Sequence, residues 1–347
     1  MLSNEFEIFL LTGFLGSGKT TLLKSFLESC DATDIGVIVN EIGNIDVDGA
    51  VLAQSAKKVP LVLLTNGCIC CAPNGDLAGT IAMLHEERAR RSMPYLRRVI
   101  VETSGIARPG PVLRELQLLG SSARTICLST FDAQDWERAV NTREGRAQLA
   151  GAQRVVITKL DSVTNFQVQQ AYAAVRCANP LAEVVEVHTN VERAHRAFAS
   201  YTMDSPRIGL DQPYSDDHGT NDAKISAALV RFEAPIDYDE LTDWLANAAG
   251  LLGDRLYRVK GFVRVSADRT VLVQGVGTTF AQPLLYPVHQ THSFLIVIGE
   301  DLKLEELRSV EPSLHSVSFF GKNQLPTAIG RSLHNTLSSR GQFNKSV

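Results

Sequence analysis

Short apolar runs alternate with helical patterns over the first two hundred residues of the chain. These runs are rich in β-branched residues and carry few polar interruptions, which is typical of strands buried on both faces of a sheet. Because helical patterns separate them, the sequence predicts an α/β fold with a mostly parallel sheet covered by helices on both sides. The predicted strands are Ile8–Leu11, Ile35–Val39, Val59–Leu64, Val99–Val101, Thr125–Leu128, Arg154–Thr158 and Val184–Val187.

Helical spacing is clearest in three of the intervening segments. Leu22 and Phe26 share an apolar stripe directly after the first strand. Gly75–Leu84 shows a second stripe, with Asp76 as a candidate N-cap. A third helix is predicted over Pro111–Leu119, because proline favours the first turn of a helix and a glycine follows the last.

The pattern changes beyond the first domain, which we expect to span residues 1–203. Residues 204–223 contain prolines, glycines and aspartates without periodicity, and they predict a linker. Residues 224–320 predict a smaller α+β domain with an open sheet face, and residues 321–347 predict a flexible tail. The predicted elements of the smaller domain are the strands Ala227–Phe232, Leu256–Val265, Thr270–Gly275 and Ser293–Ile298, a helix with Tyr238, Leu241, Leu245 and Ala248 on one face, and a helix over Leu302–Val310.

One strand of the smaller domain has a basic face. Val259 and Val263 alternate with Arg258 and Lys260, which is the pattern of a half-exposed strand. The basic side fits three roles: it can dock a client protein, dock the first domain, or be an ordinary solvated surface.

Composition narrows the class of protein. The 347 residues are 44% apolar and carry a formal net charge of −4, which argues against nucleic-acid binding through a basic surface. No apolar run approaches the roughly 20 residues that a membrane-spanning helix needs, and the N-terminus lacks the basic start of a signal peptide. We therefore expect a soluble cytoplasmic protein with no membrane partner. A homo-oligomer is compatible with the sequence.

A phosphate-binding pattern follows the first strand. The segment GFLGSGKT fits GxxxxGK[ST], in which glycines let backbone N–H groups turn toward phosphate oxygens. The lysine supplies positive charge to the β- and γ-phosphates, and the following hydroxyl can ligate Mg²⁺. The candidate phosphate-binding residues are Gly13, Gly16, Ser17, Gly18, Lys19, Thr20 and Thr21, with Lys19 and Thr20 also candidate catalytic residues.

Two further strand ends carry residues that fit the phosphate site. The segment 40–48, after the second strand, is polar and acidic and is expected to meet the Mg²⁺ or the γ-phosphate. Glu102 ends the fourth strand, where a second Mg²⁺ element is expected, and we assign it a catalytic role. Gly105 completes an E-x-x-G form of the loop that senses the γ-phosphate.

Three cysteines crowd into four positions after the third strand. Cys68, Cys70 and Cys71 form a Cys-x-Cys-Cys motif, and thiolates favour Zn²⁺ or Cu⁺ over Mg²⁺, with Co²⁺ able to imitate Zn²⁺. Glu41, Asp46, a histidine or water can fill the fourth position. The alternative is a set of buried, inert cysteines.

A candidate base-reading turn follows the sixth strand. Thr158, Lys159 and Asp161 fit the guanine-reading pattern Asn-Lys-x-Asp, with threonine in the first place. An aspartate accepts two hydrogen bonds from guanine, which adenine does not offer. The alternative is an ordinary turn at a strand end.

Taken together and in this order, the motifs resemble the CobW-like family of metal-handling P-loop GTPases. That family includes cobalamin-synthesis proteins, nitrile hydratase activators and zinc-transferring GTPases. The resemblance implies hydrolysis of GTP with Mg²⁺, coupled to delivery of a transition metal to a client metalloprotein. The family's metal ligands map onto Cys68, Cys70 and Cys71, with Glu41 as a candidate fourth ligand.

This sequence departs from the family pattern in two places. Thr158 replaces the usual asparagine, and the stretch between the domains holds only His218 where many members carry a histidine-rich loop. The sequence also shows no evident water-positioning glutamine or arginine finger, so slow turnover is expected without a partner. Two other functions fit the same motifs: a small-molecule P-loop kinase with structural cysteines, and a regulatory protein that holds nucleotide and metal without hydrolysis.

Overall fold

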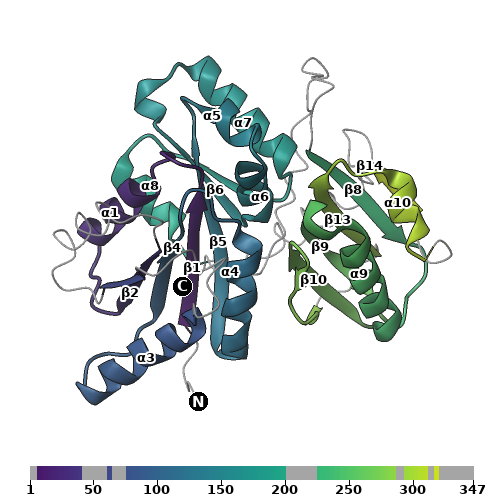
Figure 1. The fold of residues 1–347 in the computed structure, drawn as a ribbon, viewed down its shortest axis with the longest axis horizontal. Helices are drawn as coiled ribbons and strands as arrows, with labels where there is room; N and C mark the ends of the chain where they lie inside the picture. The colour runs from purple at the N-terminus through teal and green to yellow at the C-terminus, as the bar shows by residue number, and fades with distance from the viewer. Residues whose placement is uncertain are drawn as a thin grey trace, which may run out of the picture.

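The computed structural model describes residues 6–40, 61–64, 76–200, 225–286, 293–311 and 316–319. Two sheets, each with its own helices, lie side by side (Figure 1). We call residues 6–200 the N-terminal domain and residues 225–319 the C-terminal domain. The predicted linker and tail lie outside the described residues, so the exact domain boundaries stay a prediction.

A parallel sheet forms the centre of the N-terminal domain. Its strand order is β3-β2-β4-β1-β5-β6-β7, and every neighbouring pair is parallel. The predicted α/β class is therefore confirmed. The strands are β1 (Phe6–Gly13), β2 (Ile35–Asn40), β3 (Leu61–Leu64), β4 (Arg98–Glu102), β5 (Ala123–Asp132), β6 (Arg154–Thr158) and β7 (Glu183–Glu186).

Helices cover both faces of this sheet because successive strand residues point to opposite sides. Phe9 and Leu11 pack in one apolar cluster with α1 and α8, whereas Ile8 and Leu10 pack in another with α3 and α4. The helices are α1 (Lys19–Ser29), α3 (Leu77–Arg90), α4 (Pro109–Leu116), α5 (Trp136–Val140), α6 (Arg143–Gly151), α7 (Asn165–Ala178) and α8 (Asn190–Ala197), with short 3₁₀ turns at Gln117–Ser122 and Leu160–Ser162.

Two predicted helices have different ends in the structure. The side chain of Asp76 caps α3 by accepting from the backbone N–H of Gly79 at 2.6 Å, as expected. However, α3 runs six residues beyond Leu84, to Arg90. The prediction stopped short because the last buried positions of the helix are the polar His85 and Arg88, which do not continue the apolar stripe. Helix α4 begins at Pro109 rather than at the predicted Pro111, since both prolines fit its first turn.

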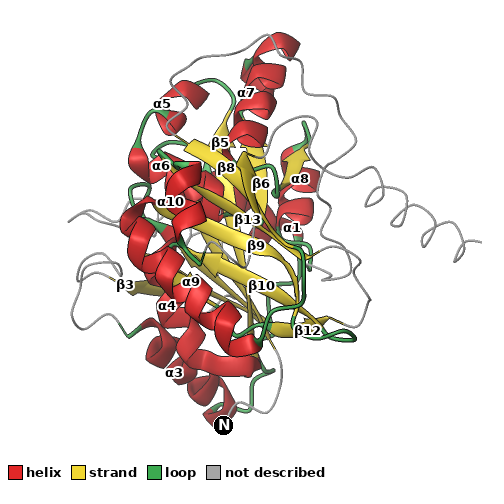
Figure 2. Ribbon diagram, turned by 90° about the vertical axis from the view of Figure 1, so that its right-hand side faces the viewer, coloured by secondary structure: helices red, strands yellow, loops and turns green. Residues whose placement is uncertain are grey.

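The C-terminal domain is an antiparallel sheet with helices on one face. Its order is β11-β10-β9-β13-β8-β14, with β12 paired to β10. Figure 2 shows α9 and α10 lying over β9, β10 and β13. The elements are β8 (Ile225–Phe232), α9 (Tyr238–Leu252), the 3₁₀ turn Gly253–Arg255, β9 (Leu256–Arg264), β10 (Thr270–Val276), β11 (Thr279–Phe280), β12 (Leu284–Tyr286), β13 (Ser293–Glu300), α10 (Leu304–Ser309) and β14 (Ser316–Phe319).

Trp244, which is fully buried on α9, anchors the core between α9 and the sheet, and its indole N–H donates to the carbonyl of Val310 at 3.1 Å. The predicted helix is present as α9, and Leu241, Leu245 and Ala248 of its predicted face are buried. Tyr238 begins the helix, and its side chain is 39% exposed.

The other face of the C-terminal sheet packs against the N-terminal domain, so the predictions of an open sheet face and a half-exposed strand are wrong. Phe262 and Ile296 join one apolar cluster with Ala147 and Ala150 of α6. On the same face of β9, Arg258 is 2% exposed, and its guanidinium donates to the carbonyl of Gly151 at 2.6 Å. Of the three roles open to the basic face, the structure shows docking to the first domain.

We expect burial of Lys260 to make stability depend on pH. Burial, aided by the charge of Arg258, lowers the pKa of Lys260 to about 7. Between that value and its ordinary pKa of about 10.4, the unfolded chain binds a proton that the folded protein does not, so stability rises with pH. The cost of the buried charge is therefore greatest below pH 7.

Replacement K260M removes this cost and should stabilise the protein at pH 6.5 by a few kcal/mol, with a much smaller gain at pH 9.5. Thermal unfolding of both proteins at the two pH values measures the effect. K303M, which removes an exposed lysine of the same domain, is the control. Equal gains at pH 6.5 and pH 9.5 would contradict the assignment.

Candidate functional site

The phosphate-binding pattern lies at the turn from β1 into α1. Gly16 and Gly18 adopt φ values of 74° and 90°, a left-handed conformation that glycine reaches without a steric penalty. Gly18 is also the N-cap of α1, and no side chain caps the helix or places an acidic charge in its first turn. The first N–H groups of α1 and the positive end of its dipole are therefore available to an anion.

Lys19 spans this loop from the first turn of α1. Its ammonium donates to the carbonyl of Gly13 at 2.9 Å and to that of Phe14 at 3.4 Å. These contacts hold the positive charge over the loop, where a phosphate would lie. Thr21, the last residue of the predicted motif, is an exposed position on α1.

The structure brings together Thr20 and Glu102, which are 82 positions apart. The hydroxyl of Thr20 donates to a carboxylate oxygen of Glu102 at 2.7 Å, and the Glu102 side chain is buried at the end of β4. Mg²⁺ prefers hard oxygen ligands such as these two groups. The pair therefore fits the Mg²⁺ site that the sequence predicts.

The loop after β4 approaches the phosphate-binding loop closely. A Cβ atom on Gly105 would lie 2.8 Å from the backbone N and Cα atoms of Leu15, so only glycine fits this position. The backbone N–H of Thr103 donates to the carbonyl of Leu11 at 2.9 Å and ties the loop to β1. Gly105 is thus adjacent to the phosphate-binding loop, as its assigned role requires.

Thr158 makes two contacts that the family pattern does not suggest. Its hydroxyl contacts the carbonyl oxygens of Ser17, at 2.8 Å, and Phe131, at 3.2 Å. These contacts tie the end of β6 to the phosphate-binding loop and to β5. Threonine therefore positions the loop here, where an asparagine is usual.

Lys159 and Asp161 complete the candidate base-reading turn. Lys159 has a left-handed φ of 57°, and its ammonium pairs with Asp132 at 2.6 Å. This pair fixes the direction of the lysine stem at the end of β6. Asp161 follows with an exposed side chain, so its carboxylate is accessible from solvent.

Sequence reasoning missed two residues that hold the site, Thr130 and Arg193. Ser17 hydrogen bonds to Thr130 through their hydroxyls at 2.6 Å, across 113 positions. Arg193, buried on α8, donates to the carbonyls of Val187 and His188, at 2.6 and 2.9 Å, and holds the segment after β7. Burial lowers the pKa of Arg193, and the charge of Asp161 opposes this shift. The sequence signal for Arg193 was its place next to the small alanines of α8.

The predicted metal ligands Cys68, Cys70, Cys71 and Glu41 lie outside the described residues. Among the residues that the structure does describe, no group of three or more His, Cys, Asp or Glu side chains could hold a metal ion. Cys127 is one of the described cysteines, and burial raises its pKa to about 12, so this thiol is inert in the core. In the same described parts of the chain, no helix has the length and apolarity to cross a bilayer.

We expect Thr158→Val to weaken nucleotide binding several-fold and to lower the free energy of unfolding by about 1–3 kcal/mol. Valine has a similar shape, but it leaves the carbonyls of Ser17 and Phe131 without the hydroxyl. Nucleotide titration by fluorescence and denaturant unfolding measure the two effects. Thr158→Ser keeps the hydroxyl and is the matched control. Nucleotide affinity of the valine variant within twofold of wild type would contradict this role for Thr158.

Known proteins are similar in sequence to this protein over most of its length. The zinc chaperone YjiA of Escherichia coli (strain K12) is 26% identical over 319 residues, which are 88% of this chain and 98% of that protein. Zinc-regulated GTPase metalloprotein activator 1 of Dictyostelium discoideum is 35% identical over 304 residues, which are 74% of this chain and 62% of that protein.

A solved structure shares the fold. The crystal structure of Zn(II)-bound YjiA GTPase from E. coli matches with a TM-score of 0.66 and 22% identity, covering 90% of this chain and 100% of that one. At this identity the likeness speaks for the fold alone.

Two family models match the sequence. The model described as "CobW/HypB/UreG, nucleotide-binding domain" matches residues 7–186, which is more than half of the chain. The model described as "Cobalamin synthesis protein cobW C-terminal domain" matches residues 225–310. The chain therefore belongs to the CobW/HypB/UreG family of nucleotide-binding proteins.

Proposed function

We propose that this protein is a GTP-hydrolysing metallochaperone that binds Zn²⁺ through its Cys-x-Cys-Cys motif and transfers the metal to a client protein. The observation that carries the proposal is the sheet order β3-β2-β4-β1. Because these strands are parallel, the loops after β2, β3 and β4 leave the sheet at the edge that holds the phosphate-binding loop. Relatives named zinc chaperone and zinc-regulated GTPase metalloprotein activator support the same function.

Different groups of the described residues would bind different parts of the nucleotide. The glycine loop and the N-terminus of α1 bind the phosphates, and Lys19 neutralises their charge. Thr20 and Glu102 would hold Mg²⁺, which when bound neutralises charge on the phosphates. Gly105, which lies against Leu15 of the phosphate-binding loop, would detect the γ-phosphate through its backbone N–H, and Asp161 would read the guanine.

The cysteine motif is the proposed site for the metal cargo. Register pairs Asn40 with Leu64 and Val39 with Glu102, so β2 lies between the strands that lead to the cysteines and to Glu102. Cys68 follows Leu64 by four residues, which span at most about 14 Å of extended chain. Glu41 follows Asn40 directly. The described ends of β2 and β3, from which the chain leads to Glu41 and Cys68, thus lie at the same edge of the sheet as Glu102, which supports the proposal.

Transfer of Zn²⁺ to a client would depend on coupling between the binding of nucleotide and the binding of the metal. Loops that contact the γ-phosphate change order when it is lost, and two such loops flank the cysteines in sequence. We propose that the nucleotide state changes cysteine geometry and so the affinity for Zn²⁺. A cytoplasmic location is part of this proposal, because crowded reactive thiols suit a reducing compartment.

We expect Zn²⁺ to bind with different affinity in the GTPγS and GDP states, and the combined variant C68S/C70S/C71S to lose this high-affinity site. Competition titration with a chromogenic zinc chelator measures the affinity. C177S, which removes an exposed cysteine on α7, is the control and should bind Zn²⁺ like wild type. Equal Zn²⁺ affinity in the two nucleotide states would overturn the coupling.

Asp161→Ala should reduce the preference for GTP over ATP at least tenfold, because the base loses both hydrogen bonds to the carboxylate. Binding of labelled GTP and ATP to both proteins gives the preference. The neighbouring exposed Ser162, replaced by alanine, is the control. An unchanged preference would favour the kinase alternative, and that enzyme would also release phosphate only with an acceptor present.

A further inference from the structure

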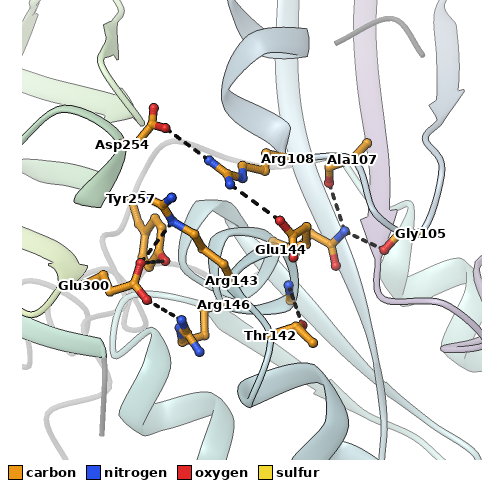
Figure 3. A network of polar contacts seen from close by, with 12 residues as sticks. Gly105, Ala107, Arg108, Thr142, Arg143, Glu144, Arg146, Asp254, Tyr257 and Glu300 are labelled. Carbon is orange, nitrogen blue, oxygen red and sulfur yellow. Dashed lines mark hydrogen bonds and ion pairs between the residues drawn. The ribbon is translucent and has the colours of Figure 1, made fainter. Parts of the chain in front are cut away.

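Helix α6 lies between the loop 103–108 and the C-terminal sheet (Figure 3). It has nine residues, and all of them except Arg143 and Glu144 are buried. Different sides of the helix contact different partners.

Toward the loop, α6 contributes Gln148. This side chain is 1% exposed, and its amide nitrogen donates to the carbonyl of Gly105 at 3.0 Å and to that of Ala107 at 2.9 Å. Both hydrogen bonds hold backbone atoms of the loop, so their geometry depends on the loop's path. A glutamine that donates to two carbonyls in the interior fixes that path, because neither carbonyl has ready access to water.

Toward the C-terminal domain, α6 contributes two arginines that meet one carboxylate. Arg146 and Arg143 both pair with Glu300, the last residue of β13, and the Arg143 contact is 3.1 Å. The hydroxyl of Tyr257 on β9 also donates to Glu300, at 2.9 Å. Although burial alone would raise it, the pKa of Glu300 lies below its ordinary value, because Tyr257 and Arg146 stabilise the carboxylate.

The ends of the same loop and helix also contact the C-terminal domain. Arg108, which closes the loop, pairs with Glu144 of α6 at 3.5 Å and with Asp254 of the C-terminal domain at 3.6 Å. Gly151 ends α6, and a Cβ atom there would lie 2.8 Å from Pro109 and 3.1 Å from Val276 of β10. The loop 103–108, helix α6 and the C-terminal sheet are therefore closely packed against one another.

We propose that α6 is a mechanical link between the γ-phosphate-sensing loop and the C-terminal domain, with Gln148 as the positioning residue for that loop. This inference rests on the proposed GTPase function. A loop that moves with the γ-phosphate must either break both Gln148 hydrogen bonds or shift α6. A shift of α6 disturbs the Glu300 cluster, so the state of the C-terminal interface and the state of the nucleotide are coupled. The coupling acts in both directions by linkage.

The test uses the full chain and compares Gln148→Met with Glu300→Gln. Methionine keeps the volume of the buried side chain and removes the donor, whereas glutamine removes the charge at the far end of the link. Arg308→Met is the control, because it removes an arginine contact inside the C-terminal domain, with the carbonyl of Val317 at 3.1 Å, that involves none of the residues of the link. Tyr257→Phe removes one hydrogen bond to Glu300 and serves if Glu300→Gln unfolds.

The decisive readout is the ratio of GTPγS affinity to GDP affinity. We expect Gln148→Met and Glu300→Gln each to lower this ratio about tenfold, and the double variant to lower it no further than the larger single effect. A merely structural defect would weaken both nucleotides alike and leave the ratio unchanged. We also expect hydrogen exchange in β9 to differ between the GTPγS and GDP complexes of wild type and to become equal in Gln148→Met.

A ratio within twofold of wild type in Gln148→Met and in the Glu300 or Tyr257 variant would overturn the link, as would a tenfold change in Arg308→Met. These outcomes are distinct from failure of the proposed function. If the wild-type protein neither distinguishes GTPγS from GDP nor releases phosphate from GTP, the GTPase function itself is rejected, and the link with it.

Discussion

Parallel pairing around β1 is the constraint on which the rest of the structure depends. The register sets Leu11 opposite Glu102 of β4 and Gly13 opposite Thr130 of β5. Residues more than eighty positions apart therefore meet at one edge of the sheet, where Thr20 reaches Glu102 and Ser17 reaches Thr130. A shift of one residue in either pairing would turn these side chains to the wrong face and dissolve the site.

The contact between the two domains combines apolar packing with buried charge. Removing arginines and a carboxylate from water is costly, and such groups remain stable only when their partners are well placed. Arg258 on the carbonyl of Gly151 and the arginines of α6 on Glu300 meet that condition. Directional contacts of this kind fix the relative position of two surfaces more narrowly than apolar packing alone. The interface is therefore specific as well as cohesive.

Much of the fold could be predicted from the sequence, because its signals are local. Continuous apolar runs gave the strands of the parallel sheet, and the glycine pattern gave the turn from β1 into α1. Helices such as α6 and α8 escaped prediction because their buried faces carry arginine and glutamine among small residues. Alternation in β9 showed which side chains were charged, but it did not reveal what covered them.

The candidate site was predictable to the same extent. Motif residues such as Lys19, Thr20 and Asp161 follow from patterns of residue type, whereas Thr130, Gln148 and Glu300 act through contacts between distant segments. No local pattern marks a glutamine whose partners are backbone carbonyls forty positions away. The part played by Thr158 was likewise hidden, since a threonine at a strand end has many uses.

The apolar cluster between the domains limits how well either domain can be produced alone. It joins Ala147 and Ala150 of α6 to the apolar face of the C-terminal sheet. A cut between the two sheets would expose apolar surface on both fragments, and it would separate Arg143 and Arg146 from Glu300 and Arg258 from the carbonyl of Gly151. Each half is thus a poor candidate for independent expression.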